Sequence, residues 1–167
     1  MLEILEAFYR EKRVYIPEPS KAMELREKGF GSLKKDKVFL SPYEVFYLVE
    51  KGRIRVIDKE SKEELGLRTL VSRLSANKPE VWIKYLIYRD LRDRGYIVRE
   101  FDKVGFEIHG KGALRRLVSI VYEGRRANLE DLEEFLKIAN REKKELILAV
   151  IDRRTDIVYY SLSELQV

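Results

Sequence analysis

The stretch that decides the fold of the second half of the chain is PEVWIKYLIYRDLRDRGYIVREFDKVGFEIHGK, residues 79–111. Proline favours the first turn of a helix and glycine favours the left-handed residue that ends one, so Pro79 and Gly95 bracket a predicted helix. After Gly95 the apolar residues follow the period of a strand. We therefore predict two short strands, over residues 96–101 and 104–109, on either side of a turn.

The predicted helix has an apolar stripe at helical spacing and a charged side that we expect to face water. The stripe comprises Val81, Tyr85, Leu86, Tyr88 and Leu91, and the charged side comprises Arg89, Asp90, Arg92 and Asp93.

The chain beyond this stretch continues with strands and one more helix. Residues 117–122 form an apolar strand, and Asn128 caps a helix whose first turn holds two acidic residues. Residues 146–151 are almost continuously apolar, as expected for a strand covered on both faces, and residues 157–162 form a last strand. This order predicts one mixed sheet with helices packed on it.

The first half of the chain predicts a smaller domain that also mixes strands and helices. Paired strands are expected within residues 1–16, before the first prolines. Ser41 with Glu44, and Ser61 with Glu64, both have the spacing of a capping box, which predicts a helix after each serine.

We place the domain boundary between Lys78 and Pro79, because a proline there separates two helices that need not be continuous. The predicted fold class is α+β, or mixed α/β. A small N-terminal α/β domain at residues 1–78 precedes a C-terminal domain at residues 79–167 that has a mixed sheet and flanking helices.

Composition excludes several kinds of chemistry. The chain has no cysteine and one histidine, which excludes disulfides and thiol or histidine metal clusters, so we expect no metal and no cofactor. A net charge of +5 permits a nucleic-acid partner. The N-terminus lacks a signal peptide and no run approaches the ~20 apolar residues of a membrane span, so we expect a cytoplasmic protein without a membrane partner. The high Lys, Arg and Glu content indicates a heat-adapted source.

Three blocks of the sequence together resemble the archaeal tRNA-splicing endonuclease family. The first block is residues 40–56 with the core YLVEKGRI, and the second is YLIYRDLR at residues 85–92 followed by RGYIV. The third block begins at Lys143 and ends with DIVYY at residues 156–160. The blocks lie in the family's order and cover most of the chain. The resemblance implies that the C-terminal domain is nuclease-like.

The resemblance implies an activity on RNA. The family excises introns from precursor tRNA at bulge–helix–bulge sites, where the ribose 2′-hydroxyl attacks the adjacent phosphate. The products are a 2′,3′-cyclic phosphate and a 5′-hydroxyl, and no metal is required. The family is thought to use a tyrosine, a histidine and a lysine as base, acid and cation.

The residues at the three triad positions differ from the family pattern. Lys144 fits the lysine position, His109 occupies the place of the tyrosine, and Ala113 falls where the histidine belongs. The resemblance therefore implies a structural subunit of a heterotetramer, whose paralogous catalytic subunit supplies the complete triad. The expected partners are that subunit and precursor tRNA.

Other interpretations of these residues stay open. One alternative is a self-sufficient metal-independent ribonuclease in which His109 and Lys144 carry the chemistry. Another is an RNA-binding module without nuclease activity. A metal-dependent nuclease would need clustered carboxylates beside a lysine, which the stretch around Glu107 does not supply. Alternatively, His109 is an ordinary strand residue and Lys144 a solvated surface charge.

Two further features bear on partners. The family pairs its C-terminal strand across a dimer, and residues 157–162 are suitably apolar. The family also inserts an acidic loop into a neighbouring subunit, whereas the matching loop here, residues 123–126, reads EGRR. We expect a basic face that follows an RNA backbone. Its candidate residues are Arg115, Arg116, Arg125, Arg126, Arg153 and Arg154.

Overall fold

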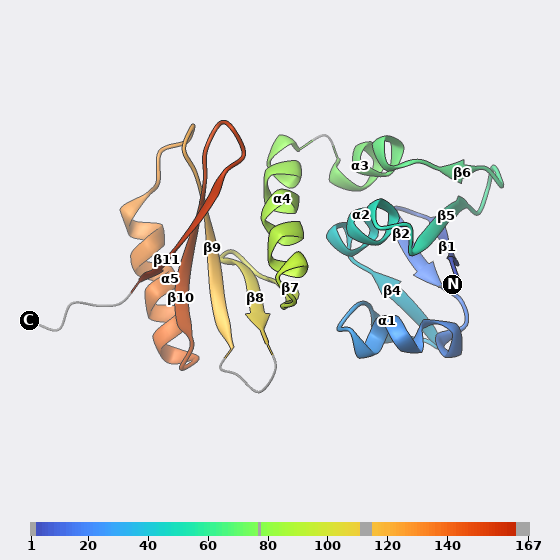
Figure 1. Ribbon diagram of the computed structural model, residues 1–167, viewed down its shortest axis with the longest axis horizontal. Coiled ribbons are helices and arrows are strands. Elements are labelled where there is room, and N and C mark those ends of the chain that lie inside the picture. Colours follow the sequence, from blue (N-terminus) through green and yellow to red (C-terminus); the bar gives the residue numbers. More distant parts are fainter. Residues whose placement is uncertain (1–2, 77, 111–114, 163–167) are drawn as a thin grey trace, which may run out of the picture. The chain divides into compact units, whose positions relative to one another are not determined.

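The computed structural model describes residues 3–76, 78–110 and 115–162 (Figure 1). By its internal contacts the chain divides into two compact units, between Tyr85 and Leu86. This division lies inside helix α4 (Pro79–Asp93), so that helix contributes residues to both units. The boundary between residues 78 and 79 stays a prediction.

The N-terminal unit is built on a six-stranded sheet in the order β3-β4-β2-β1-β5-β6. Strands β1 and β5 are parallel, and every other neighbouring pair is antiparallel. Alternate side chains of the central strands are fully buried against the helices of this unit and form its core. The strands are β1 (Leu5–Arg10), β2 (Arg13–Ile16), β3 (Ser32–Lys34), β4 (Lys37–Leu40), β5 (Ile54–Asp58) and β6 (Glu64–Leu65).

The capping box predicted at Ser41 is confirmed. The hydroxyl of Ser41 accepts a hydrogen bond from the backbone N–H of Glu44, whose carboxylate in turn accepts from the backbone N–H of Ser41 at 2.9 Å. The second oxygen of Glu44 accepts from the N–H of Gly31 at 2.6 Å, so the buried carboxylate is satisfied. The helical segments of this unit before α4 are η1 (Pro19–Ala22), α1 (Met23–Glu27), α2 (Pro42–Glu50) and α3 (Leu67–Ser75).

The helix start predicted at Ser61 is wrong. Glu64 and Leu65 form the short strand β6, which pairs with β5 and buries Leu65 opposite Val56. The hydroxyl of Ser61 instead accepts from the N–H of Glu63 within the preceding turn. Strand pairing therefore outweighs the local capping signal, and α3 begins three residues after Glu64.

The C-terminal unit is a five-stranded sheet in the order β11-β10-β9-β8-β7, with β9 and β10 parallel and the rest antiparallel. Helix α5 packs on one face through a cluster that includes Leu117, Ala139 and Leu146. Tyr88 of α4 packs edge-on against Phe106, whose side chain points to the other face. Helices α4 and α5 thus lie on opposite faces of this sheet (Figure 1). The remaining elements are β7 (Ile97–Phe101), β8 (Gly105–His109), β9 (Arg116–Tyr122), α5 (Leu129–Arg141), β10 (Glu145–Ile151) and β11 (Ile157–Leu162).

The predicted mixed sheet with flanking helices is therefore confirmed, but one residue of α4 differs from its prediction. Arg92, expected to face water, is only 7% exposed. Its Nε donates to the hydroxyl of Tyr88 at 3.1 Å, and its guanidinium lies over the same ring. The long arginine side chain lies along the aromatic surface, which lets a charged residue join the buried side of the helix.

None of the helices in the described part of the chain has the length and apolar character needed to cross a membrane.

Candidate functional site

A lysine and a glutamate from separate parts of the C-terminal sheet form a close ion pair. Lys144 directly precedes β10, and its Nζ lies 2.6 Å from Oε2 of Glu107 on β8. Strand β9 lies between β8 and β10, so the lysine side chain crosses a strand to reach the carboxylate. Both side chains are 14% exposed, and this burial reduces the screening by water that weakens surface pairs.

The end of α5 positions Lys144. Lys143 has a φ of 54°, the left-handed conformation that commonly ends a helix, here without glycine. The backbone N–H of Lys144 then donates to the carbonyl of Ala139 at 2.8 Å. This closing turn sets the direction in which the chain enters β10, and with it the direction of the Lys144 side chain.

Three further groups surround the pair. Nη1 of Arg115 lies 3.3 Å from Oε1 of Glu107, so the carboxylate has a cation near each oxygen. A carboxylate oxygen of Glu142 lies 3.9 Å from Nζ of Lys144. The Lys144 ammonium also lies over the ring of Phe101, 5.1 Å from its centroid. The charge of Lys144 is therefore balanced inside the chain.

His109 is the last residue of β8 and is partly exposed. Glu107 lies two residues before it, so the two side chains emerge on the same face of the sheet, whereas Phe106 and Ile108 are buried on the other. His109 and Lys144 thus lie at the same end of the sheet. Ala113 lies outside the described residues.

The six candidate arginines divide between the two ends of the sheet. Arg115 and Arg116 lie at the start of β9, and Nε of Arg116 lies 3.2 Å from Oε2 of Glu145. The other four lie beyond the opposite ends of β9 and β10, roughly 20 Å away for strands of this length. These are Arg125 and Arg126 in the β9–α5 loop, and Arg153 and Arg154 in the β10–β11 turn.

Glu123 holds the two arginine-bearing loops together. A carboxylate oxygen of Glu123 accepts from the backbone N–H of Arg153 at 3.3 Å, and the N–H of Glu123 donates to the carbonyl of Ile151 at 3.0 Å. The four arginines at this end are exposed. This group is called here the arginine end (Arg125, Arg126, Arg153 and Arg154).

Glu107 is the residue that sequence reasoning missed. Its position two residues before His109 places both on one face, and this signal was available in the sequence. Its partner 37 residues further on depends on the order of the strands, which the sequence alone does not give. Within residues 3–76, 78–110 and 115–162, no three His, Asp or Glu side chains gather to hold a metal ion.

Comparison with known proteins decides the family. Residues 5–71 match the model of the N-terminal domain of tRNA intron endonuclease, and residues 81–159 match its catalytic C-terminal domain. The chain belongs to the tRNA intron endonuclease family. The resemblance inferred from the three sequence blocks is thereby confirmed.

The relatives of this tRNA intron endonuclease chain are archaeal proteins of similar length. It is 36% identical to the tRNA-splicing endonuclease of Pyrococcus furiosus over 97% of each chain. It is 35% identical to that of Pyrococcus horikoshii over the same share, and 31% identical to that of Methanococcus maripaludis over 93% of this chain and 92% of the relative. The family places the chain in tRNA processing.

Proposed function

We propose that this chain is the structural, non-catalytic subunit of a tRNA-splicing endonuclease. A paralogous subunit with a complete triad completes a heterotetramer with it. The complex excises introns from precursor tRNA at bulge–helix–bulge sites and leaves 2′,3′-cyclic phosphate and 5′-hydroxyl ends. The observation that carries this proposal is the ion pair that occupies Lys144, the one triad position retained in the sequence.

The chemistry of the cleavage explains why this pair matters. An ammonium stabilises a pentavalent phosphate only if its charge is available to the developing oxyanion. Here the phosphate would compete with a carboxylate held 2.6 Å from Nζ. The position of the general acid holds alanine, and general acid catalysis is worth about 10²–10⁴-fold in rate.

The edge of the C-terminal sheet supports a role in assembly. Strand β11 forms one edge of the sheet, and an unpaired edge is a template for pairing with another chain. Two large apolar side chains on one face of β11 are exposed, Val158 by 50% and Tyr160 by 56%. A partner strand added at this edge would extend the sheet and cover both side chains.

The direct test is cleavage of a bulge–helix–bulge precursor tRNA in the presence of EDTA. We expect no cleavage by this chain alone, and cleavage by its mixture with the triad-containing paralogue. Lys144→Ala in this chain should leave the rate of the mixture unchanged. Cleavage by the chain alone that His109→Ala abolishes would establish the self-sufficient ribonuclease instead.

A further inference from the structure

Three neighbouring strands of the N-terminal sheet each contribute one aromatic ring to a continuous row. Phe8 of β1 lies opposite Tyr15 of β2, and Tyr15 lies opposite Phe39 of β4. The ring centroids are 6.2 Å apart for the first pair and 5.9 Å for the second. This aromatic row (Phe8, Tyr15 and Phe39) runs perpendicular to the strands.

The aromatic row lies on the face of the sheet opposite the core. The neighbours of its members along the strands, such as Ala7, Ile16 and Val38, are fully buried, and side chains alternate between the faces of a sheet. Phe8 and Phe39 are partly exposed, whereas Tyr15 between them is only 8% exposed, so the two phenylalanine rings are the accessible ends of the row.

Each ring of the row has a cation above it. Nζ of Lys59 lies 4.7 Å from the centroid of Phe8, and Nζ of Lys37 lies 4.8 Å from that of Tyr15. The guanidinium carbon of Arg13 lies 5.8 Å from the centroid of Phe39. These three side chains are exposed, so their charged groups can also reach a ligand on this face.

The strand register also places like charges opposite each other on this face. Arg10 lies opposite Arg13, and Lys34 lies opposite Lys37. Like charges directly opposite in a sheet destabilise it. A bound polyanion would remove this repulsion, because each pair would then share negative charge.

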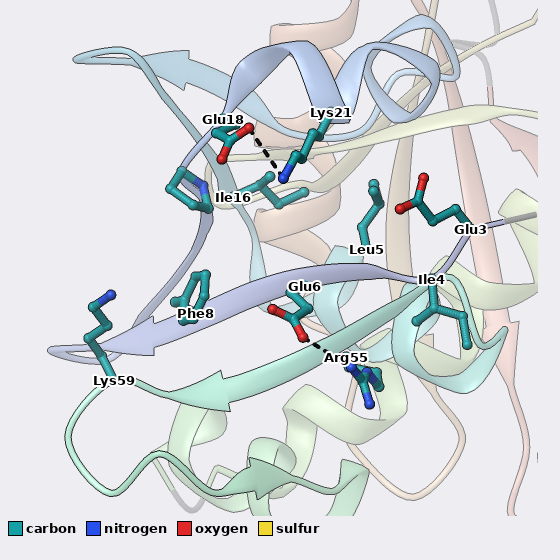
Figure 2. A pocket seen from close by; sticks show the side chains of 11 residues that line it. Glu3, Ile4, Leu5, Glu6, Phe8, Ile16, Glu18, Lys21, Arg55 and Lys59 are labelled. Carbon is teal, nitrogen blue, oxygen red and sulfur yellow. Dashed lines mark hydrogen bonds and ion pairs between the residues drawn. The ribbon is translucent and has the colours of Figure 1, made fainter.

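A hollow of about 460 Å³ lies beside Phe8 (Figure 2). Its wall includes Lys59 and the pair formed by Glu6 and Arg55, 3.0 Å apart. The volume falls within the roughly 300–1,000 Å³ typical of clefts for small molecules. An unstacked base that reaches the end of the row at Phe8 would find space there.

We propose that the aromatic row, with Lys37, Lys59 and Arg13, binds single-stranded RNA. Bases stack on the rings, and the displaced cations turn to the phosphates. Because every base has a π-face, this mode has little sequence preference. The proposal rests on the proposed function only in taking RNA as the polyanion, since binding here requires neither the catalytic subunit nor cleavage.

The test measures binding of a fluorescein-labelled 12-nucleotide oligouridylate to the whole chain by fluorescence anisotropy. Base stacking contributes about 1–3 kcal/mol per base, so Phe8→Leu and Phe39→Leu should each weaken binding by roughly 5- to 150-fold. Trp82→Leu, which changes an exposed aromatic residue outside the row, is the matched control and should bind as the wild type does. Urea unfolding verifies that each variant folds.

The charges are tested separately. The double variant Lys37→Gln and Lys59→Gln should make the negative slope of log K against log salt shallower by about 1.4. This is the change expected when two contacts to a single strand are lost. Unchanged affinity in folded Phe8→Leu and Phe39→Leu variants would overturn the proposal. A second outcome would also overturn it. If the wild-type chain does not bind the oligouridylate and the row variants lose binding to the catalytic paralogue, the face contacts protein and not RNA.

The two proposals can fail independently. Oligouridylate binding that depends on the row, together with cleavage by the chain alone, would contradict only the structural-subunit role. Cleavage that requires the mixture, with no effect of the row variants on RNA binding, would contradict only the aromatic row.

Discussion

Glu107 determines what Lys144 can contact. The carboxylate holds the ammonium at 2.6 Å and also has Arg115 beside its other oxygen. Breaking a buried ion pair from one side is more costly than losing a surface pair, because the remaining charge stays poorly solvated. The stability of the C-terminal unit therefore depends on a residue at the candidate site.

We predict that Glu107→Gln lowers the free energy of unfolding by about 1–3 kcal/mol, because Lys144 loses its charged partner in a part-buried setting. Urea denaturation measures this change. The control is Glu142→Gln, whose carboxylate is 3.9 Å from the same ammonium and 43% exposed. That variant should stay within about 0.5 kcal/mol of the wild type, and equal losses in both variants would contradict the prediction.

At the arginine end, Arg153→Ala with Arg154→Ala is expected to weaken binding of precursor tRNA. Because two phosphate contacts are lost, the negative slope of log K against log salt should become shallower by about 1.4–1.8. Arg115→Ala is the comparison, because its guanidinium is already paired with Glu107 and should leave the slope unchanged. Anisotropy titrations between 50 and 200 mM salt would show the difference; a slope that responds only to Arg115 would locate the RNA at the other end.

At the scale of elements, Tyr159 joins β11 to α4. Its hydroxyl donates to Oδ2 of Asp90 at 2.6 Å, and the same oxygen accepts from Nε of Arg94 at 2.9 Å. Burial, and then the hydrogen bond to the Asp90 carboxylate, raise the pKa of Tyr159 well above its ordinary value. The neutral phenol is thus the form that the folded chain favours.

The raised pKa of Tyr159 determines how the stability of the folded chain changes with pH. Because the pKa of Tyr159 is higher in the folded than in the unfolded chain, its contribution is complete below pH ~10 and is lost as the pH rises above that value. The free energy of unfolding of Tyr159→Phe should therefore be roughly 1–2 kcal/mol lower than that of the wild type at pH 7. The difference between the two chains should narrow above pH 10. Thermal unfolding of both chains from pH 7 to 11 tests this; a difference that widens with pH would contradict it.

Local signals in the sequence predicted elements well where the signal and the strand pairing agree. The Ser41–Glu44 capping box predicted the start of α2 because no strand competes for those residues. The same spacing at Ser61 did not start a helix, because pairing with β5 buries the side chain of Leu65 and stabilises a strand there instead. The prediction that Arg92 faces water was wrong for a similar reason, because its guanidinium packs on the ring of Tyr88 one helical turn away.

For the candidate site, the resemblance to the family assigned His109 and Lys144 to triad positions, and that assignment stays a prediction. Their location at one end of the sheet follows from strand pairing, which the sequence order alone leaves undetermined. The contact between Lys144 and Glu107 spans an intervening strand and 37 residues. Long-range pairs of this kind depend on sheet order and burial, so they were beyond sequence reasoning.

At the scale of the whole molecule, the proposed structural role makes assembly with the catalytic paralogue the property to test. We expect Val158→Lys with Tyr160→Lys to abolish association with the catalytic paralogue, because two charges would enter an apolar interface at the β11 edge. Light scattering after size-exclusion chromatography measures the mass of the complex. Met23→Lys, at a similarly exposed apolar residue of the N-terminal unit, should assemble normally. A complex of unchanged mass with the β11 variant would rule out this edge as the interface.

The ion pair between Glu107 and Lys144 also bears on whether substitutions could make the proposed structural subunit catalytic. A chain with His109→Tyr and Ala113→His would carry the family's three side chains, yet its lysine would still be bound to a carboxylate. Recovery would require a third change, at Glu107, which by itself lowers stability without adding activity. If the chain is the structural subunit that we propose, no single one of these three substitutions restores activity, and the complex stays dependent on both chains.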